Sequence, residues 1–251
     1  MNLPCHRFDA VDSTLLEAKR IRTTVKGPFT VVSRVQTGGV GRLGRTWSSP
    51  AGGLWYTLAW PASLPLARYG ALPLVAGLAV VETMDPFLAD SMAHTAIKWP
   101  NDILLNDAKV AGILCQSASD SAGLVFFIGI GINVSFPHTA LPRDLRHPAT
   151  TLALETGSSV DPEALEAPLT GHLARLLTTY EREGFAPMLP ELQSRLAWLH
   201  QQVCAEIDGE GTVQGELCGV SAAGHLHLLT ARGMREVASG EVRRLRPAQG
   251  A

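Results

Sequence analysis

The run Lys98-Trp99-Pro100-Asn101-Asp102 combines a cation, an amide and a carboxylate, and a second cation follows at Lys109. Two lysines on neighbouring strands that fold back on each other can neutralise a polyanion such as a polyphosphate. The carboxylate of Asp102 could hold Mg²⁺ on such a ligand. The same side chains could instead form a solvent-exposed ion pair on a turn, which would contribute little to stability. The spacing leaves both interpretations open.

A glycine-rich stretch, residues 38–53, follows a predicted strand and carries Arg42 and Arg45. Its first glycines match G-x-G-x-x-G, but a dinucleotide-binding fold needs a helix directly afterwards and an acidic residue about 20 positions on. Adjacent serines and a proline follow instead, and no acidic residue occurs between Arg45 and Glu82. We therefore exclude the dinucleotide fold and interpret the stretch as an anion-binding loop, with a glycine-rich hairpin and solvated arginines as the alternative.

Hydroxyl and amide side chains occur at several expected element ends. Ser13 and Thr14 begin a helix predicted over residues 12–22, in which Thr14 and Glu17 fit a capping box. As N-cap residues the two hydroxyls need no ligand, although they could also contact a polar head group. Gln36, directly before the glycine-rich stretch, is open to the same two interpretations.

Asn133 is an amide within the apolar run Leu124–Val134, where glycines alternate with isoleucines. A buried asparagine must find hydrogen-bond partners, and a ligand could supply them. A turn at the end of the strand is the alternative, and the run alone does not decide between them.

Apolar and β-branched patterns predict the elements that must position these side chains. We expect strands over residues 30–35, 54–60, 103–105, 110–115 and 124–134, with a hairpin-like turn at 106–108. Helices are expected over 72–84, from Asp161-Pro162 to Gly184, and over 188–199, with a polar loop at 137–148. Short strands and glycine turns follow His200, at 203–207, 212–220, 226–229 and 235–237, which is typical of a small β-barrel. The prediction is an α+β domain with a mixed sheet over 1–199 and a barrel over 200–251.

The composition excludes several classes of protein. The 251 residues are 46% hydrophobic and 18% charged, so a large core can form and disorder is not expected. A net charge of -2 argues against nucleic-acid binding through overall charge. The four cysteines form no Cys-x-x-Cys pair and indicate reduced thiols. No signal-like segment is present and the apolar run Leu72–Val81 is too short to span a bilayer, so we expect a cytoplasmic protein.

Together, the motifs resemble those of bacterial biotin–protein ligases. The resemblance is carried, in order, by Asp12-Ser13-Thr14, by Gln36 with Gly41–Trp47, by Lys98–Asp102 with Lys109–Leu114, and by Gly129–Asn133. It extends over nearly the whole chain and implies a catalytic domain like that of class II aminoacyl-tRNA synthetases, followed by an SH3-like barrel. Because the first motif lies close to Met1, we expect the monofunctional type, without an N-terminal DNA-binding domain and without operator binding.

The resemblance implies an enzyme that forms a C–N bond in two steps. Biotin and MgATP give biotinyl-5′-adenylate and diphosphate, and biotin then passes to a lysine of a biotin carboxyl carrier domain, usually of acetyl-CoA carboxylase, with release of AMP. Biotin and MgATP are substrates, and no tightly bound prosthetic group is expected. The carrier lysine is the nucleophile, so the enzyme needs none. Homodimers occur in the family, whereas partners such as DNA or a membrane are not expected.

The resemblance also implies roles for individual residues. Lys109 would lie between the biotin carboxylate and the α-phosphate, and Lys109 and Arg42 would be the catalytic cations. Biotin would contact Ser13, Thr14, Leu15, Gln36, Val40, Gly41, Arg42, Trp47, Lys109 and Gly112. The nucleotide would contact Arg42, Arg45, Lys98, Asn101, Asp102 and Asn133, with Asp102 on Mg²⁺. The cations would let two mutually repelling acids react.

Three positions depart from the family pattern. Val40 stands where many members have arginine, so one cation is lost. Leu15 replaces an asparagine that often follows the Ser-Thr pair. Ala149 lies near a position where some members stack a tryptophan on adenine, so this cap is absent or built differently.

Two other functions are compatible with the same architecture. A lipoate–protein ligase or octanoyltransferase shares the catalytic fold but would lack the Trp99-Pro100-Asn101-Asp102 signature. A non-catalytic biotin-binding sensor would bind biotin without labelling a carrier domain. Exchange of diphosphate into ATP, tested with each acid, separates the three.

Overall fold

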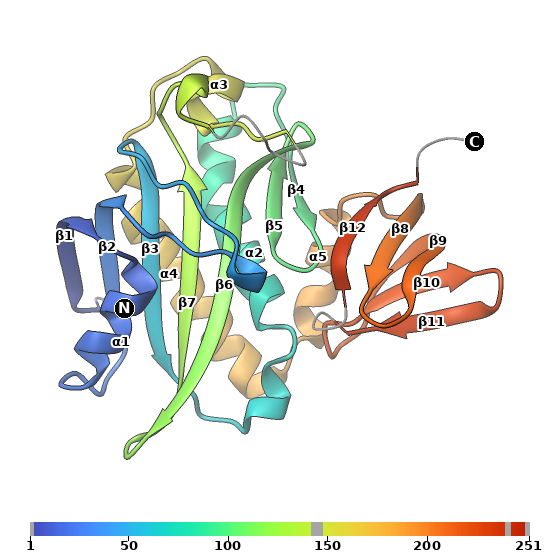
Figure 1. Cartoon of the computed structure of the whole chain (residues 1–251), viewed down its shortest axis with the longest axis horizontal. Coiled ribbons are helices and arrows are strands. Elements are labelled where there is room, and N and C mark those ends of the chain that lie inside the picture. Colours follow the sequence, from blue (N-terminus) through green and yellow to red (C-terminus); the bar gives the residue numbers. More distant parts are fainter. Residues whose placement is uncertain (1–2, 142–147, 239–241, 249–251) are drawn as a thin grey trace.

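The computed structural model describes residues 3–141, 148–238 and 242–248, and its larger unit is built on a seven-stranded mixed sheet (Figure 1). The strands are β1 (Cys5–Val11), β2 (Phe29–Gln36), β3 (Gly53–Pro61), β4 (Thr95–Lys98), β5 (Asp102–Leu105), β6 (Ala108–Asp120) and β7 (Gly123–Asn133). Their order is β1-β2-β3-β7-β6-β5-β4. β1 and β2 are parallel, and every other neighbouring pair is antiparallel.

Isoleucines and glycines alternate along β7, so the two faces of this sheet differ at this strand. Residues two apart on a strand point to the same side. Ile128, Ile130 and Ile132 belong to the main core. Gly129 and Gly131 occupy the other face, where an added Cβ would meet side chains of α1 (Thr14–Arg22) and of the glycine-rich loop. The sheet is therefore bare of side chains at these positions.

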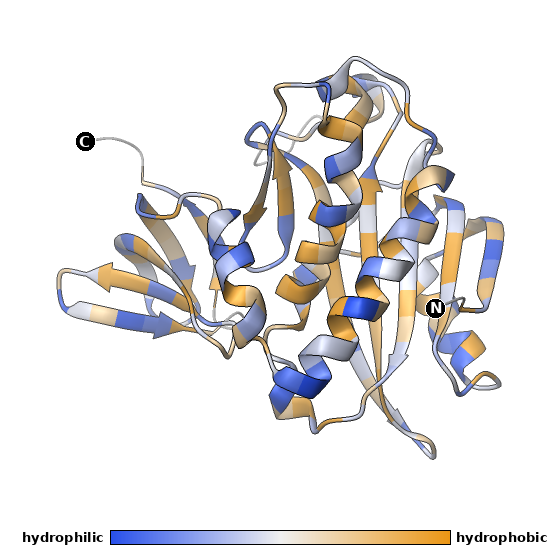
Figure 2. Ribbon diagram, turned by 180° about the vertical axis from the view of Figure 1, so that it is seen from behind, coloured by the Kyte–Doolittle hydropathy of each residue, from blue (hydrophilic) through white to orange (hydrophobic). Residues whose placement is uncertain are grey.

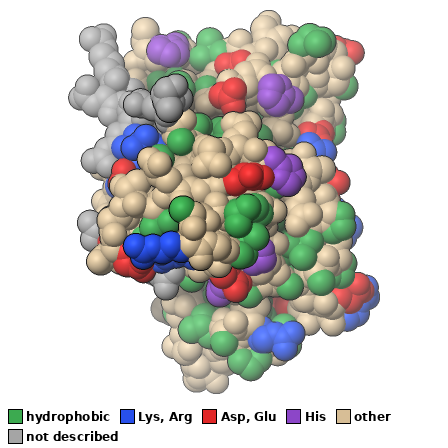
Figure 3. Space-filling view, turned by 90° about the vertical axis from the view of Figure 1, so that its right-hand side faces the viewer, with side chains coloured by type: hydrophobic (Ala, Val, Ile, Leu, Met, Phe, Trp, Pro, Cys, Tyr) green, Lys and Arg blue, Asp and Glu red, His purple; other side chains and the backbone are tan. Residues whose placement is uncertain are grey.

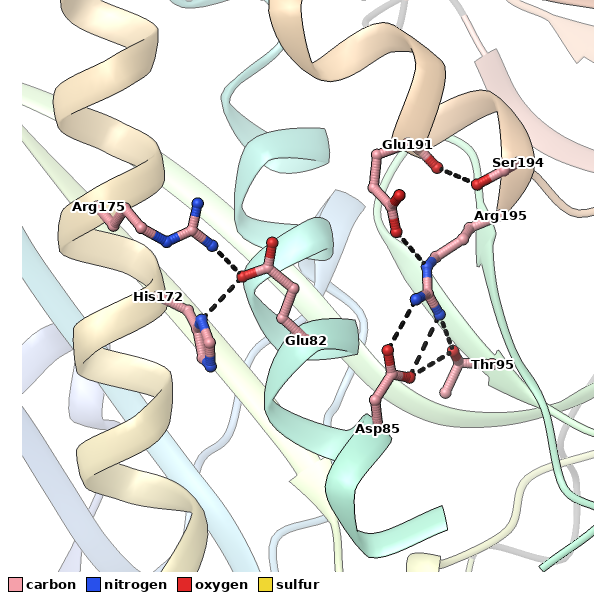
Figure 4. Close-up of polar contacts among 8 residues, drawn as sticks. All are labelled: Glu82, Asp85, Thr95, His172, Arg175, Glu191, Ser194 and Arg195. Atoms are coloured by element: carbon pink, nitrogen blue, oxygen red, sulfur yellow. Dashed lines mark hydrogen bonds and ion pairs between the residues drawn. The ribbon is translucent and has the colours of Figure 1, made fainter. Parts of the chain in front are cut away.

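Helices cover both faces of the sheet. The long helices α2 (Leu72–Met84) and α4 (Glu163–Glu183) lie across one face (Figure 2). They are linked by Glu82, whose carboxylate accepts from Arg175 and from His172 Nδ1 at 2.8 Å (Figure 4). α1 packs through Leu15 and Ala18 on the opposite face. The stretch Leu66–Leu88 is long and apolar enough to cross a membrane, but 72% of its apolar 18-residue window is buried inside the protein, as expected of a core helix.

The C-terminal part forms a second sheet. Its strands are β8 (Gln202–Ile207), β9 (Gly211–Val220), β10 (Leu226–Thr230), β11 (Gly233–Val237) and β12 (Val242–Pro247). They are antiparallel, in the order β11-β10-β9-β8-β12. The arrangement is consistent with the predicted SH3-like barrel, although β11 and β12 do not pair within the described residues, so the barrel is not closed there.

The surface carries mixed charges. On the face in Figure 3, Lys and Arg side chains are scattered among Asp, Glu and His, without a continuous basic patch among the residues coloured there. With a net charge of -2, positive charge for a polyanionic ligand must come from a local site.

The two sheets meet beside β4. The Trp99 indole donates to Gly224 O in the β9–β10 turn at 3.0 Å. The chain between α5 (Leu189–Ser194) and β8 runs along β4, where the Ile97 amide donates to Arg195 O at 2.7 Å and the Ala197 amide to Ile97 O at 3.0 Å. The C-terminal sheet is therefore attached next to the Lys98 motif.

The predicted strands are all confirmed, and no helix follows the glycine-rich pattern, where Arg42–Gly44 forms one 3₁₀ turn.

Two local predictions are wrong. Ser13, rather than Thr14, is the N-cap of α1 and makes no side-chain capping bond. The helix expected over 188–199 ends at Ser194, because the following residues pair with β4. In the predicted loop 137–148, His138–Ala140 form a 3₁₀ turn, and residues 142–147 lie outside the described part.

Candidate active site

A cavity of about 490 Å³ lies on the α1 side of the sheet, within the range typical of small-molecule sites. Residues 38–47 cross in front of β7 and β6 at this place (Figure 1). The cavity is lined by the start of α1, the glycine-rich loop, the Lys98–Asp102 motif, the first half of β6, the end of β7, and β12. Every residue predicted to contact biotin or nucleotide lines it, so motifs far apart in the sequence meet at one place.

Lys98 and Lys109 converge on one carboxylate. Lys98 ends β4 and pairs in register with Asp102, and its Nζ lies 3.7 Å from Asp102 Oδ2. Lys109 Nζ donates to Asp102 Oδ1. The ion pair envisaged at this turn is therefore present but lines a cavity, with the Lys98 residue only 7% exposed. Burial lowers the pKa of Lys98; Asp102 opposes this shift, while Lys109 and Arg244 add to it.

Lys109 is held at three points. Its amide donates to Pro148 O at 2.8 Å, and its carbonyl accepts from the Thr150 amide at 3.0 Å. Its Nζ lies 5.0 Å from the centroid of the Trp47 ring, within the range of a cation–π contact. Backbone and side chain of Lys109 are thus both fixed at the cavity wall.

Paired glycines make room for Trp47. Gly112 of β6 and Gly131 of β7 are direct partners across the sheet. A Cβ would lie 2.5 Å from Trp47 Nε1 at Gly131 and 3.1 Å from the same ring at Gly112, so the indole rests against bare backbone. Trp47 Nε1 is buried and has no hydrogen-bond partner among the described residues. A ligand atom that accepts a hydrogen bond would satisfy it.

A hydrogen-bonded group fixes the polar residues at the start of α1. Gln36 Oε1 accepts from the Thr14 amide at 2.8 Å and from Thr14 Oγ1 at 3.1 Å. Thr57 Oγ1 donates to Thr14 Oγ1 at 2.9 Å, and Gln36 Nε2 donates to Ser49 Oγ at 2.7 Å. Ser13 is buried next to this group. Protein contacts therefore orient hydroxyl and amide groups at the cavity wall in advance.

The glycine-rich loop is a hairpin closed over the cavity. The Gly41 amide donates to Arg45 O at 2.7 Å and the Trp47 amide to Gly39 O at 2.9 Å. Arg42 reaches Asn101 Oδ1 at 3.1 Å. Burial lowers the pKa of the Arg42 guanidinium. The hairpin interpretation is thus right for the backbone, and Arg45 is exposed, but Arg42 is not a solvated arginine.

Comparison with known proteins identifies the family. Residues 7–133 match the model of the biotin/lipoate A/B protein ligase family. A biotin--[acetyl-CoA-carboxylase] ligase of Paracoccus denitrificans is 33% identical over 92% of this chain and 96% of its own length. The chain belongs to the biotin/lipoate A/B protein ligase family.

Solved structures of ligases share the whole fold. The biotin protein ligase of Aquifex aeolicus in complex with biotin and ATP matches with a TM-score of 0.82 and 30% identity, covering 98% of this chain and 99% of that one. The biotin protein ligase of Leishmania major in complex with biotinyl-5-AMP matches with a TM-score of 0.67 and 28% identity, covering 95% and 100%. The predicted fold class is confirmed, and the protein is a ligase.

The cavity of this ligase also includes residues that the sequence analysis missed. Val242, Arg244 and Leu245 of β12 line it, so the C-terminal sheet contributes to the site. Arg244 Nε is buried without a hydrogen-bond partner among the described residues, and its guanidinium lies 3.7 Å from Glu206. The arginine-rich end of the sequence was the available signal, but nothing local shows that it folds back against Lys98.

The predicted nucleotide contact Asn133 and the departure from the family pattern at Ala149 both lie at the cavity of the ligase. Asn133 is buried at the end of β7, and its Nδ2 donates to Thr150 O at 3.0 Å, so one of its two amide hydrogens is paired within the protein. Ala149 pairs with Lys109 in an isolated bridge and lines the cavity, so its backbone helps to fix the position of Lys109.

The donors in this ligase suit a magnesium ion that arrives with a nucleotide. Within the described residues no three His, Cys, Asp or Glu side chains are grouped as a metal site. Asp102 is the one carboxylate among the described residues that line the cavity. Mg²⁺ commonly takes one or two carboxylates together with substrate phosphates, so Asp102 alone fits an ion held mainly by phosphate.

Proposed function

We propose that this ligase activates biotin with MgATP and transfers it to a lysine of a biotin carboxyl carrier domain of acetyl-CoA carboxylase. In the first step a biotin carboxylate oxygen bonds to the α-phosphorus, and the bond from that phosphorus to the leaving diphosphate breaks. In the second step the carrier amine bonds to the biotin carbonyl carbon, AMP leaves, and the amine loses a proton. The convergence of Lys98 and Lys109 on Asp102 inside one cavity carries this proposal.

The first step needs positive charge because a carboxylate must approach a polyphosphate. Two unit charges 4 Å apart repel by about 4 kcal/mol at the effective dielectric near a protein surface. Lys109, on β6 with its Nζ against the Trp47 ring, is the cation for the reacting oxygens, and Arg42 stabilises charge that develops at phosphorus. Magnesium held by Asp102 would add charge neutralisation on the phosphates.

The rest of the cavity suits biotin. Thr14 and Gln36, oriented by hydrogen bonds, supply polar groups for the ureido ring together with Ser13. Trp47 and the bare strip at Gly112 offer an apolar wall for the thiophene ring and valeryl chain. The remaining biotin contacts are Leu15, Val40 and Gly41, of which Val40 contributes backbone only. On the nucleotide side we propose Arg45, Lys98, Asn101, Asp102 and Asn133.

The second step needs no nucleophile from the enzyme, because the adenylate is a mixed anhydride that the carrier amine can attack. What the enzyme must do is keep water away until the carrier arrives. The hairpin over residues 38–47, with Arg42 linked to Asn101, is suited to cover the anhydride. The names of the Paracoccus relative and of the two ligase structures support this choice of substrates and partner.

One assay tests the proposal against its alternatives. The purified chain should exchange labelled diphosphate into ATP when biotin is present, and should then label a carrier domain with biotin. Exchange that depends on lipoate or octanoate and not on biotin would make it a lipoate-type ligase. Biotin binding without exchange or labelling would make it a sensor.

Substitution of Gly131 with alanine should weaken biotin use specifically. The added Cβ would fall 2.5 Å from Trp47 Nε1, so the ring must leave the sheet. Overpacking of this kind should weaken biotin binding by between about 5-fold and 100-fold. We expect to measure this as a higher KM for biotin in the exchange assay. Gly171→Ala, in α4, is the matched control, because apart from its chain neighbours and the backbone of α4 itself the added carbon has no described atom within 4 Å. Equal KM values for both variants would remove Trp47 from the biotin site.

A further inference from the structure

We propose that Trp198 is a positioning residue of this ligase: its ring holds the Lys98 ammonium where a nucleotide phosphate meets it. The proposal rests on the nucleotide role of Lys98 in the proposed function. Trp198 does not line the cavity, so it would act only through Lys98.

The contact between the two residues joins the C-terminal part of the chain to the Lys98 motif. Lys98 Nζ lies 5.6 Å from the centroid of the Trp198 ring, within the limit of a cation–π contact. The side chain of Lys98 is 9% exposed, so little water competes with the ring. Cation–π contacts strengthen as the cation loses water.

The segment before Trp198 is fixed to the residue before Lys98. Ile97 bonds through its amide to Arg195 and through its carbonyl to Ala197. The guanidinium of Arg195 is in turn held by Asp85 at 2.7 Å and donates to Thr95 at 3.2 Å (Figure 4). Lysine and tryptophan are therefore carried by two segments that cannot slide past each other without breaking these bonds.

The backbone conformation of Trp198 indicates that its side chain is needed. Its φ is +63°, in the left-handed region where a bulky residue is an outlier and glycine is free of strain. Such outliers persist when surrounding contacts over-determine them, and they cluster at functional sites. A large aromatic residue at a position suited to glycine therefore points to the ring, rather than the backbone, as what this position supplies.

The charges around Lys98 explain what the ring would do. Asp102 on β5 attracts the ammonium, while Lys109 on β6 and Arg244 on β12 repel it. Without a contact on its remaining side, the Lys98 ammonium would have Asp102 as its only attractive partner. The ring face attracts the ammonium from the side of the C-terminal segment and so keeps Lys98 Nζ 3.7 Å from Asp102 Oδ2.

Three variants at Trp198 test the proposal. Trp198→Leu keeps apolar volume without a ring, and Trp198→Gly removes the ring while relieving the backbone. Both should raise the KM for MgATP in biotin-dependent exchange, and the Kd for MgATP in calorimetry, by about 2-fold to 30-fold. The KM for biotin should not change. Trp198→Phe keeps a ring face and should restore most of the MgATP affinity.

A double-substitution cycle separates positioning from folding. In a Lys98→Ala background, Trp198→Leu should have no further effect on MgATP. Leu199→Ala removes a neighbouring side chain that packs on the same core and should leave the KM for MgATP unchanged. Additive effects in the cycle, or equal losses in the Phe and Leu variants, would overturn the proposal. If the wild type shows no biotin-dependent exchange, the proposed function fails, and MgATP calorimetry on the same variants still decides the role of Trp198.

Discussion

Replacing Lys109 with alanine is expected to lower biotin-dependent ATP–diphosphate exchange by about 10²-fold to 10³-fold, the loss found when one oriented charge-stabilising donor is removed. The variant loses the cation that lies between Asp102 and Trp47 and that we place between the two reacting acids. It should fold normally, because Lys109 is partly exposed and Lys98 remains as a partner for Asp102. Exchange rates and thermal unfolding on one preparation measure both outcomes.

Lys26→Ala is the matched control for this experiment. Lys26 also pairs with an aspartate, Asp120 at 3.1 Å, but it lies outside the cavity. Its loss should leave exchange unchanged, which would show that the effect at Lys109 does not come from losing any lysine–aspartate pair. Wild-type exchange in the Lys109 variant would remove this lysine from the mechanism.

The central part of the fold could be predicted because its signals are local. Isoleucines and glycines alternate along β7, and a turn at Asn106 and Asp107 joins β5 to β6. Both turn residues have positive φ, which asparagine and aspartate tolerate better than most residues. Once β4, β5 and β6 are antiparallel neighbours in this order, Lys98 at the end of β4 and Lys109 at the start of β6 lie on the two strands that flank β5. Their meeting at Asp102 therefore follows from short-range patterns.

The contacts between distant segments could not be predicted in this way. The edge strands β1, β4 and β12 are short or carry charged residues, so their period is weak in the sequence. The end of the 188–199 helix is decided by pairing of Leu196 with Ile97, a contact between segments about 100 residues apart in sequence number. The places of Arg244 and Trp198 beside Lys98 depend on the same junction. No local propensity encodes such a contact.

The capping box at Thr14 failed for a related reason. The pattern treats Thr14 as a free hydroxyl that seeks the helix backbone. In the structure its Oγ1 instead exchanges hydrogen bonds with Gln36 and Thr57 on two strands of the sheet. A residue whose side chain is engaged by the sheet cannot cap its own helix. The departure from the local rule therefore falls at the cavity, where local rules are most often broken.

Arg42→Ala should release the biotinyl adenylate into solution faster than the wild type does. Arg42 Nη1 donates to Asn101 Oδ1 at 3.1 Å, and Nη2 lies 3.4 Å from Val242 O, so this side chain joins the hairpin to the Lys98 motif and to the C-terminal sheet. Removing a hydrogen bond from a charged group costs about 1.5–3 kcal/mol, or roughly 10-fold to 150-fold. Single-turnover reactions without carrier, followed by rapid filtration, measure the adenylate that leaves.

The Arg42→Lys variant shows whether retention of the adenylate depends on closure of the hairpin or only on the positive charge. Lysine keeps the positive charge but lacks the planar fork that reaches Asn101 and Val242 together. If closure of the hairpin retains the adenylate, Arg42→Lys should restore the exchange rate lost in Arg42→Ala more fully than it restores retention of the adenylate. If it recovers both equally, charge is sufficient and the hairpin is not the barrier to release. Arg175→Ala, which breaks the exposed pair with Glu82 on the far face of the sheet, is the control and should retain the adenylate as the wild type does.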